Sequence, residues 1–210
     1  YNYFVNSCAV ADSNLYVLEG TIGPSKLHVY NLFTNYAFDS LWVGNNAVNI
    51  AVSQDGSHIF TSTDLLSNTV YVSKYKKSDS TLSDIVVAKP SGEFSFASGT
   101  FFMSDNGKKV LSNSGVLFSD QMSVLHDFDT HSLPSFLSND GSVVVFFQGK
   151  NADVYDANGY GILRTKLLPN FGGDNYSYSS LLPFYYQGVL YVAVNYADVT
   201  NTARTIITRL

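Results

Sequence analysis

The sequence predicts an all-β fold built from repeated four-stranded antiparallel units. Helical periodicity is nearly absent, and short runs of β-branched and aromatic residues alternate with Gly, Asn, Asp and Ser. The pattern Ser-x-Asp/Asn-Gly recurs at 53–56, 104–107 and 138–141, and its last two residues suit the positive φ angles of tight turns. Equivalent points at residues 14, 56, 107, 141 and 188 are 42, 51, 34 and 47 residues apart. This spacing matches the length of a propeller blade, so the predicted fold is a β-propeller.

Each repeat is predicted to contain two hairpins joined by a loop. The second repeat has predicted strands at 48–52, 58–62, 69–74 and 84–88, and the fourth at 135–137, 143–147, 152–155 and 162–167. The run from Val143 to Phe147 is apolar on both faces, as expected of a strand packed between neighbouring blades. Since one blade cannot bury both of its faces, the repeats are expected to stack around a ring.

The chain is predicted to form a single propeller domain, with repeats at about 6–45, 46–92, 93–130, 131–172 and 173–210 plus 1–5. The last repeat has only three predicted strands, at 181–185, 189–195 and 204–208. Residues 3–5 precede the first repeat's own strands, and we expect them to complete the last blade and close a five-bladed ring. The alternative is a segment of a six- or seven-bladed propeller.

Composition excludes several classes of protein. The 210 residues carry a net charge of −5, and no basic cluster exceeds the one at 74–77, so nucleic acid is not an expected partner. No apolar run approaches the roughly 20 residues that span a bilayer. The single cysteine, Cys8, excludes an internal disulfide and a cysteine metal site.

Low charge and many Tyr, Ser, Asn and Thr favour an extracellular or cell-surface location, with the periplasm as an alternative. The chain resembles a mature or excised segment.

Two segments resemble a known family of repeats. Leu27–Asn31, followed by Val43–Phe60 with its Val-Gly and Ala-Val-Ser-Gln-Asp-Gly sequences, is similar to the YVTN-type repeat of surface-layer β-propellers. Gln54 stands where that repeat usually has proline. Asp153–Gly159 similarly resembles the Val-Tyr-Asp-Ala-x-Thr-Gly hairpin of such blades. The resemblance implies a propeller used as a cell-surface or adhesion module, or as an enzyme such as a lactonase.

The histidines and acidic residues do not form a recognised catalytic motif. The four histidines, His28, His58, His126 and His131, lie outside any Gly-x-Ser-x-Gly or triad sequence. His28 and His58 fall at strand positions, which indicates structural roles, and only His131 is expected near a ligand-binding face. The predicted first strands of the blades contain no Asp or Glu, although propeller glycosidases need carboxylates there. This argues strongly against such a glycosidase.

Metal binding has weak support in the sequence. Asp153, Asp156 and Asn158 lack the alternating spacing of a calcium loop, so a hairpin turn is the better interpretation. The glycines of Phe171–Asn175 would let backbone carbonyls approach an ion. We therefore expect no cofactor, with calcium at this loop as an alternative.

The sequence suggests a binding surface on loops. Tyrosine beside Asn, Ser and Asp suits carbohydrate stacking or a protein partner. Tyrosines expected near turns or loops are Tyr75, Tyr160, Tyr176, Tyr178 and Tyr196. The predicted contact residues are Asn46, Asp64, His131, Asp174 and Tyr176.

Two functions are compatible with these residues. The first is a non-catalytic exported or cell-surface module that binds a protein or glycan, with other domains flanking it in a larger surface protein. The second is a lactonase-like hydrolase with a metal in the central channel, for which Asn49 is an inner ligand and Asn46 and His131 help from nearby loops. The absence of catalytic motifs favours the binding module.

Overall fold

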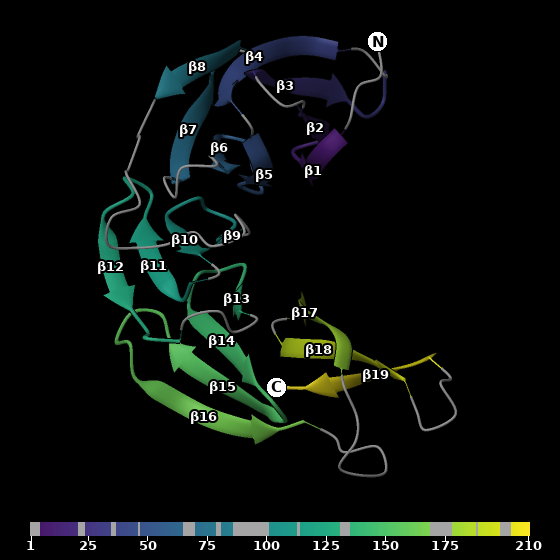
Figure 1. The fold of residues 1–210 in the computed structure, drawn as a ribbon, viewed down its shortest axis with the longest axis vertical. Coiled ribbons are helices and arrows are strands. Elements are labelled where there is room, and N and C mark those ends of the chain that lie inside the picture. Colours follow the sequence, from purple (N-terminus) through teal and green to yellow (C-terminus); the bar gives the residue numbers. More distant parts are fainter. Residues whose placement is uncertain are drawn as a thin grey trace. The chain divides into compact units, whose positions relative to one another are not determined.

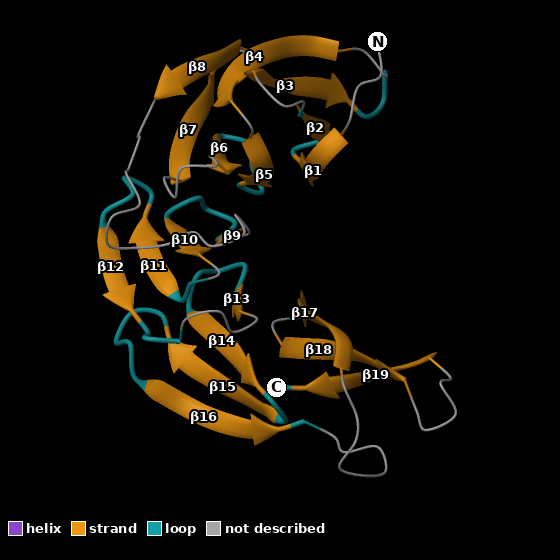
Figure 2. Cartoon of the chain, viewed as in Figure 1, coloured by secondary structure: helices purple, strands orange, loops and turns teal. Residues whose placement is uncertain are grey.

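The chain forms two compact units, Tyr1–Ser132 and Leu133–Leu210. The computed structural model describes residues 5–20, 24–34, 37–45, 47–64, 70–78, 81–85, 101–112, 114–130, 135–168, 178–187, 189–197 and 203–210. Within these ranges every regular element is a β-strand and none is a helix (Figure 2). Accordingly, this part of the chain holds no helix with the length and hydropathy needed to cross a membrane.

The first unit contains three sheets, each made of four antiparallel strands in chain order (Figure 1). The first sheet comprises β1 (Val5–Ala11), β2 (Asn14–Glu19), β3 (Pro24–Asn31) and β4 (Ala37–Asn45). The second comprises β5 (Ala47–Val52), β6 (His58–Asp64), β7 (Val70–Ser78) and β8 (Thr81–Ile85). The third comprises β9 (Phe101–Met103), β10 (Lys109–Ser112), β11 (Val116–Ser119) and β12 (Val124–Asp127). Strand β5 contacts both β1 and β9, so the sheets follow one another through their first strands.

The second unit contains one four-stranded and one three-stranded antiparallel sheet. The four-stranded sheet comprises β13 (Ser135–Leu137), β14 (Val143–Gln148), β15 (Asn151–Asp156) and β16 (Ile162–Leu167). The three-stranded sheet comprises β17 (Tyr178–Tyr186), β18 (Val189–Ala197) and β19 (Ala203–Arg209). Arg164 of β16 donates a hydrogen bond of 2.8 Å from its Nη2 to the carbonyl oxygen of Leu210.

These small up-and-down antiparallel sheets are β-propeller blades, which confirms the predicted fold class. The structure shows four complete blades, and the fifth sheet has three described strands. The predicted place of Val5 is wrong: it belongs to β1, where it pairs with Glu19 of the first sheet. The reason is that β2 extends to Glu19 and offers a pairing partner for Val5, so β1 begins before the predicted start of the first repeat at about residue 6. Residues 1–4 lie outside the described part of the chain.

Apolar side chains on both faces of the second sheet hold the first unit together. Neighbouring side chains of a strand point to opposite faces. Ile59 of β6 belongs to a cluster with Tyr16, Leu18 and Leu27 of the first sheet. The next residue, Phe60, belongs to a second cluster with residues of the third sheet, namely Phe101, Val110, Val116, Phe118 and Met122. The middle blade therefore packs against a neighbour on each side.

Strand β14 confirms the prediction that its two faces are both buried. Val144, Val145, Phe146 and Phe147 are each at most 3% exposed. The Phe146 ring packs edge-on against that of Tyr155 on β15, with 5.7 Å between the ring centres.

Candidate functional site

The predicted loop site lies almost entirely outside the described residues. This applies to Asn46, His131, Asp174 and Tyr176, and to the calcium alternative at 171–175. Asp64 is the last residue of β6, where its backbone pairs with Val70. The proposed contacts of these five residues remain predictions.

The Ser-x-Asp/Asn-Gly pattern forms a turn stabilised by its own side chains. In the second sheet, Ser53 Oγ donates to Asp55 Oδ1 at 2.6 Å and accepts from the His58 amide at 2.9 Å. The Gly56 amide donates to the Ser53 carbonyl at 2.8 Å, and Gly56 has φ of 67°. Serine and aspartate side chains thus satisfy the polar groups of the turn, while glycine adopts the left-handed conformation.

The two other copies of the pattern have nearly the same geometry. Ser104 Oγ donates to Asn106 Oδ1 at 2.8 Å, and Ser138 Oγ donates to Asp140 Oδ1 at 2.6 Å. Their glycines have φ of 68° and 70°. The predicted turns between the first and second strands of these blades are therefore confirmed.

Backbone hydrogen bonds join four turns of the first unit into what we call the turn row, comprising residues 11–14, 31–34, 53–58 and 104–109. The Leu32 amide donates to the Ser13 carbonyl at 3.0 Å, within the first sheet. The Asp12 amide donates to the Gln54 carbonyl at 3.1 Å, and the Gln54 amide donates to the Asp105 carbonyl at 2.9 Å. The turn row therefore crosses all three sheets of this unit.

The β3–β4 turn displays two apolar side chains. Leu32 is 43% exposed and Phe33 is 82% exposed. Asn31 Oδ1 accepts hydrogen bonds from the Phe33 amide at 2.9 Å, the Thr34 amide at 3.0 Å and Thr34 Oγ1 at 3.3 Å. This turn is not among the binding loops that the sequence predicted. The sequence feature that could have indicated this turn is an asparagine followed by two apolar residues at positions where polar residues are usual.

The carboxylate of Asp55 is stabilised in its charged form. Hydrogen bonds from the Ser53 hydroxyl, and from the amide and hydroxyl of Ser57, lower the pKa of Asp55 from 3.8 to about 2. Burial raises the pKa of Asp140, but hydrogen bonds from Ser138 and Ser142 outweigh this and lower it. The same turn design thus favours ionised carboxylates in two different blades.

This depressed pKa predicts a loss of stability in acid. The Asp55 contribution is present above the unfolded-state pKa near 3.8 and disappears as pH falls through about 2. Asp55→Asn is a matched change, because Asn106 fills the same position in the third sheet with an equivalent bond. We expect the urea midpoint of Asp55→Asn to fall less steeply than that of the wild type between pH 4 and pH 2. If the urea midpoints of the two proteins fall equally steeply with pH, Asp55 does not make this contribution to stability.

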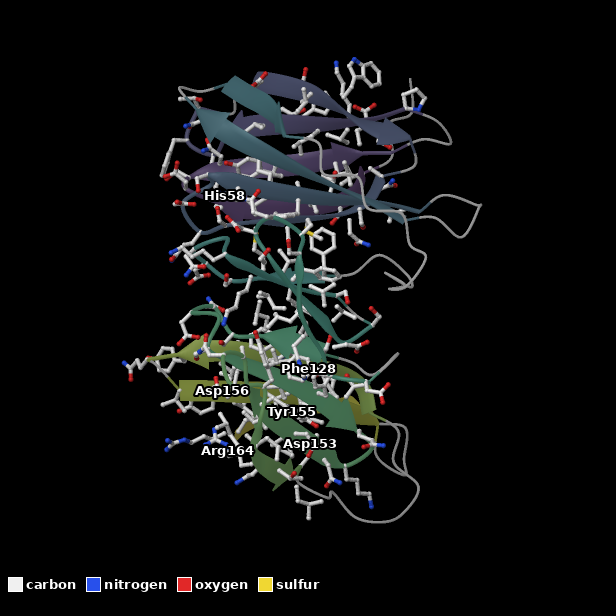
Figure 3. All side chains as sticks on the ribbon, turned by 90° about the vertical axis from the view of Figure 1, so that its left-hand side faces the viewer. His58, Phe128, Asp153, Tyr155, Asp156 and Arg164 are labelled. Carbon is white, nitrogen blue, oxygen red and sulfur yellow. The ribbon has the colours of Figure 1, made fainter. Side chains whose placement is uncertain are left out.

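Asp55, Ser57 and His58 are close together, but the way in which they are hydrogen-bonded does not suit nucleophilic catalysis. Ser57 Oγ donates to Asp55 Oδ1 at 2.7 Å and lies 2.7 Å from His58 Nδ1 (His58 is labelled in Figure 3). In a hydrolytic triad the histidine accepts the serine proton and the carboxylate orients the histidine. Here the carboxylate accepts from the serine, so the arrangement stabilises the turn.

His28 and His126 also occupy strands. His28 on β3 lies with its Nε2 2.7 Å from Glu19 Oε2 on β2, and both side chains are about 20% exposed. His126 on β12 packs its ring edge-on against Phe128, with 4.7 Å between the centres. The predicted strand positions of His28 and His58 are confirmed.

Asp153 and Asp156 of β15, both labelled in Figure 3, form hydrogen bonds with different partners. Asp153 accepts from Thr165 Oγ1 at 2.6 Å, whereas Asp156 Oδ1 accepts from the Asn158 amide at 2.8 Å. The Asp156 amide donates to the Gly161 carbonyl at 2.9 Å, which closes the hairpin. The interpretation of this segment as a turn is confirmed. Across the described ranges, no three His, Cys, Asp or Glu residues converge as a metal site.

The tyrosines expected at loops have different positions. Tyr160 follows the β15–β16 turn with φ of 61°. Tyr75 instead lies within β7, where it pairs with Ile59 and Asp84, so its predicted loop position is wrong. The reason is that β7 continues to Ser78, beyond its predicted end. Tyr178 and Tyr196 pair with each other near the ends of β17 and β18, and Tyr176 lies outside the described residues.

Comparisons with known proteins show a likeness of fold. No protein-family model and no curated protein matches the chain. Similar solved structures include hydrazine synthase from Kuenenia stuttgartiensis and the mitotic checkpoint complex, each with a TM-score of 0.62 and 14% identity. The matches cover 98% and 96% of this chain, but 65% and 63% of those chains. The chain thus spans just under two thirds of the chains it matches, and 14% identity shows the fold alone.

Proposed function

We propose that this chain is a non-catalytic β-propeller module that binds a protein partner. The observation that carries this proposal is the turn row, which presents polar and apolar side chains on backbone held by hydrogen bonds across three blades. Pre-organised surfaces lose little conformational entropy on binding, as a recognition module requires. One of the similar structures is that of an assembly, the mitotic checkpoint complex, which is consistent with this role.

We further propose that the module belongs to an exported or cell-surface protein of the YVTN, surface-layer type and takes part in adhesion. The low content of charged residues, 14%, and the single cysteine support this location. A glycan is the alternative partner, and flanking domains are part of the proposal. We retain five blades as the proposed count, with β17–β19 as the fifth. The greater length of the matched chains supports the alternative of a larger ring.

A binding and turnover screen tests this function. The purified chain is applied to protein and glycan arrays, and is assayed against a panel of lactones with and without EDTA. We expect binding to one or more arrayed proteins and no hydrolysis above the buffer rate. Lactone hydrolysis that EDTA abolishes would contradict the proposal and support the lactonase-like alternative. Binding to glycans alone would assign the alternative class of partner.

A further inference from the structure

Within its described residues, 31–34, the β3–β4 turn exposes an aromatic side chain that makes none of the hydrogen bonds of the turn. Asn31 Oδ1 accepts three hydrogen bonds from Phe33 and Thr34 in residues 31–34, and none of the three involves the side chain of Leu32 or Phe33. A polar residue would serve the turn equally well. Phe33 is nevertheless 82% exposed, so its ring contributes almost nothing to the core. Burial of an aromatic ring in a partner is strongly favourable, and aromatic residues are enriched among binding hot spots.

The backbone that carries Phe33 is restrained in two ways. Asn31 Oδ1 accepts from the Phe33 amide, and the Leu32 amide donates to Ser13 in the neighbouring turn. The adjacent Asp12 amide continues the connection to Gln54 of the second sheet. Phe33 therefore projects from a support that extends across blades, and its turn needs little ordering on binding.

Acidic side chains accompany Phe33 along the first sheet and the turn row. Asp12 and Asp55 are exposed and Asp39 is half-buried. Lys26 is the one basic residue among residues 5–45 apart from His28, and its Nζ lies 5.4 Å from the centre of the Trp42 ring. His28 is engaged with Glu19. The lysines of the turn row, Lys108 and Lys109, lie at the β9–β10 turn of the third sheet. Among residues 5–45, the carboxylates of Asp12, Glu19 and Asp39 outnumber the single lysine, so the segment that carries Phe33 has a net negative charge.

We infer that Leu32 and Phe33 form the anchor for a protein partner that has an apolar pocket edged by lysine or arginine. This inference rests on the proposed function and specifies its surface and the chemistry of its partner. The apolar side chains supply the buried centre of the contact. The carboxylates of Asp12, Asp39 and Asp55 supply attraction at its rim and orient the partner. A membrane with anionic headgroups would be repelled by the same carboxylates.

The test uses a phage-displayed library of disulfide-cyclised peptides, which can form concave surfaces. Clones are selected on the wild-type chain, and their affinities are then measured for Phe33→Ser and for the control Leu163→Ser. Leu163 is a suitable control because it is 60% exposed and lies in a different sheet. We expect selected clones to be rich in lysine and arginine. Phe33→Ser should raise Kd at least tenfold, whereas Leu163→Ser should leave it unchanged. Asp12→Asn should raise Kd a few-fold, and this effect should shrink at high salt.

Several results would overturn the inference. Clones that bind Phe33→Ser as tightly as the wild type would remove the anchor but leave the binding module in place. Failure of every arrayed protein, glycan and displayed peptide to bind would remove the proposed function itself. Binding to phosphatidylserine vesicles that requires Phe33 would replace the protein partner by a membrane. The thermal unfolding curve of Phe33→Ser shows whether this variant folds. If it does not fold, Leu32→Ser serves as a second variant.

Discussion

Replacing Phe60 with alanine is expected to lower the free energy of unfolding of the first unit by about 3–5 kcal/mol. Phe60 is fully buried and packs with Phe101, Phe118 and Met122 between the second and third sheets. Phe101 and Phe118 lie on hydrogen-bonded strands, which cannot easily move into the space left by the ring. The loss therefore combines the hydrophobic contribution of Phe60 with the cost of a cavity. Urea unfolding followed by far-ultraviolet circular dichroism measures this loss.

Phe33→Ala is the matched control for Phe60→Ala, because the same side chain is removed from a site that is 82% exposed. We expect it to change the free energy of unfolding by less than about 0.5 kcal/mol. A loss below about 1 kcal/mol for Phe60→Ala would show that the surrounding side chains refill the cavity. Such a result would contradict the tight packing of this blade interface. Equal losses in the two variants would contradict the assignment of Phe60 to the core.

Gly56→Ala is expected to be the next most damaging change, with two separate causes. Gly56 has φ of 67°, a conformation that costs a residue with a Cβ about 1–2 kcal/mol. An added Cβ would also lie 2.6 Å from the hydroxyl oxygen of Tyr16. Tyr16 is fully buried in the cluster between the first and second sheets, so its ring cannot move freely. Overpacking of this kind typically adds about 1–3 kcal/mol.

Gly149→Ala separates these two causes. Gly149 has φ of 56°, but nothing lies within 4 Å of its added Cβ. We expect Gly149→Ala to show only the conformational cost, and Gly56→Ala to show a larger loss of unfolding free energy. Chemical denaturation of the two variants beside the wild type gives both values. Equal losses would mean that the second sheet accommodates the methyl group by shifting its turn away from Tyr16.

Much of the local structure was predictable because it depends on residues close together in the chain. The strands at 135–137 and 162–167 have the predicted bounds, and the three Ser-x-Asp/Asn-Gly turns form where predicted. Serine, Asp or Asn, and glycine complete these turns within six residues, so no distant contact is needed. The ends of strands were predicted less accurately, because pairing with a neighbour decides where a strand ends. Strands β7 and β8 were predicted at 69–74 and 84–88, but they pair over 74–78 and 81–85.

The turn row was not predicted from the sequence, because its hydrogen bonds join turns that are far apart in the chain. Composition drew attention to tyrosines, although Tyr75 lies within a strand. The exposure of Phe33 depends on how the β3–β4 turn leaves the first sheet. Its connection to the second sheet, through Ser13, Asp12 and Gln54, consists of backbone bonds that carry no sequence signature.

The sequence by itself determined the all-β propeller class, the repeated turns and the absence of Asp and Glu from the first strand of each blade, because these follow from residue type and short spacing. Only the tertiary structure decided that Val5 extends β1, that Ile59 and Phe60 pack against different sheets, and that Phe33 stands exposed within the turn row. These outcomes depend on which strands and blades meet. Such contacts join residues that are far apart in the chain, and local patterns do not encode them.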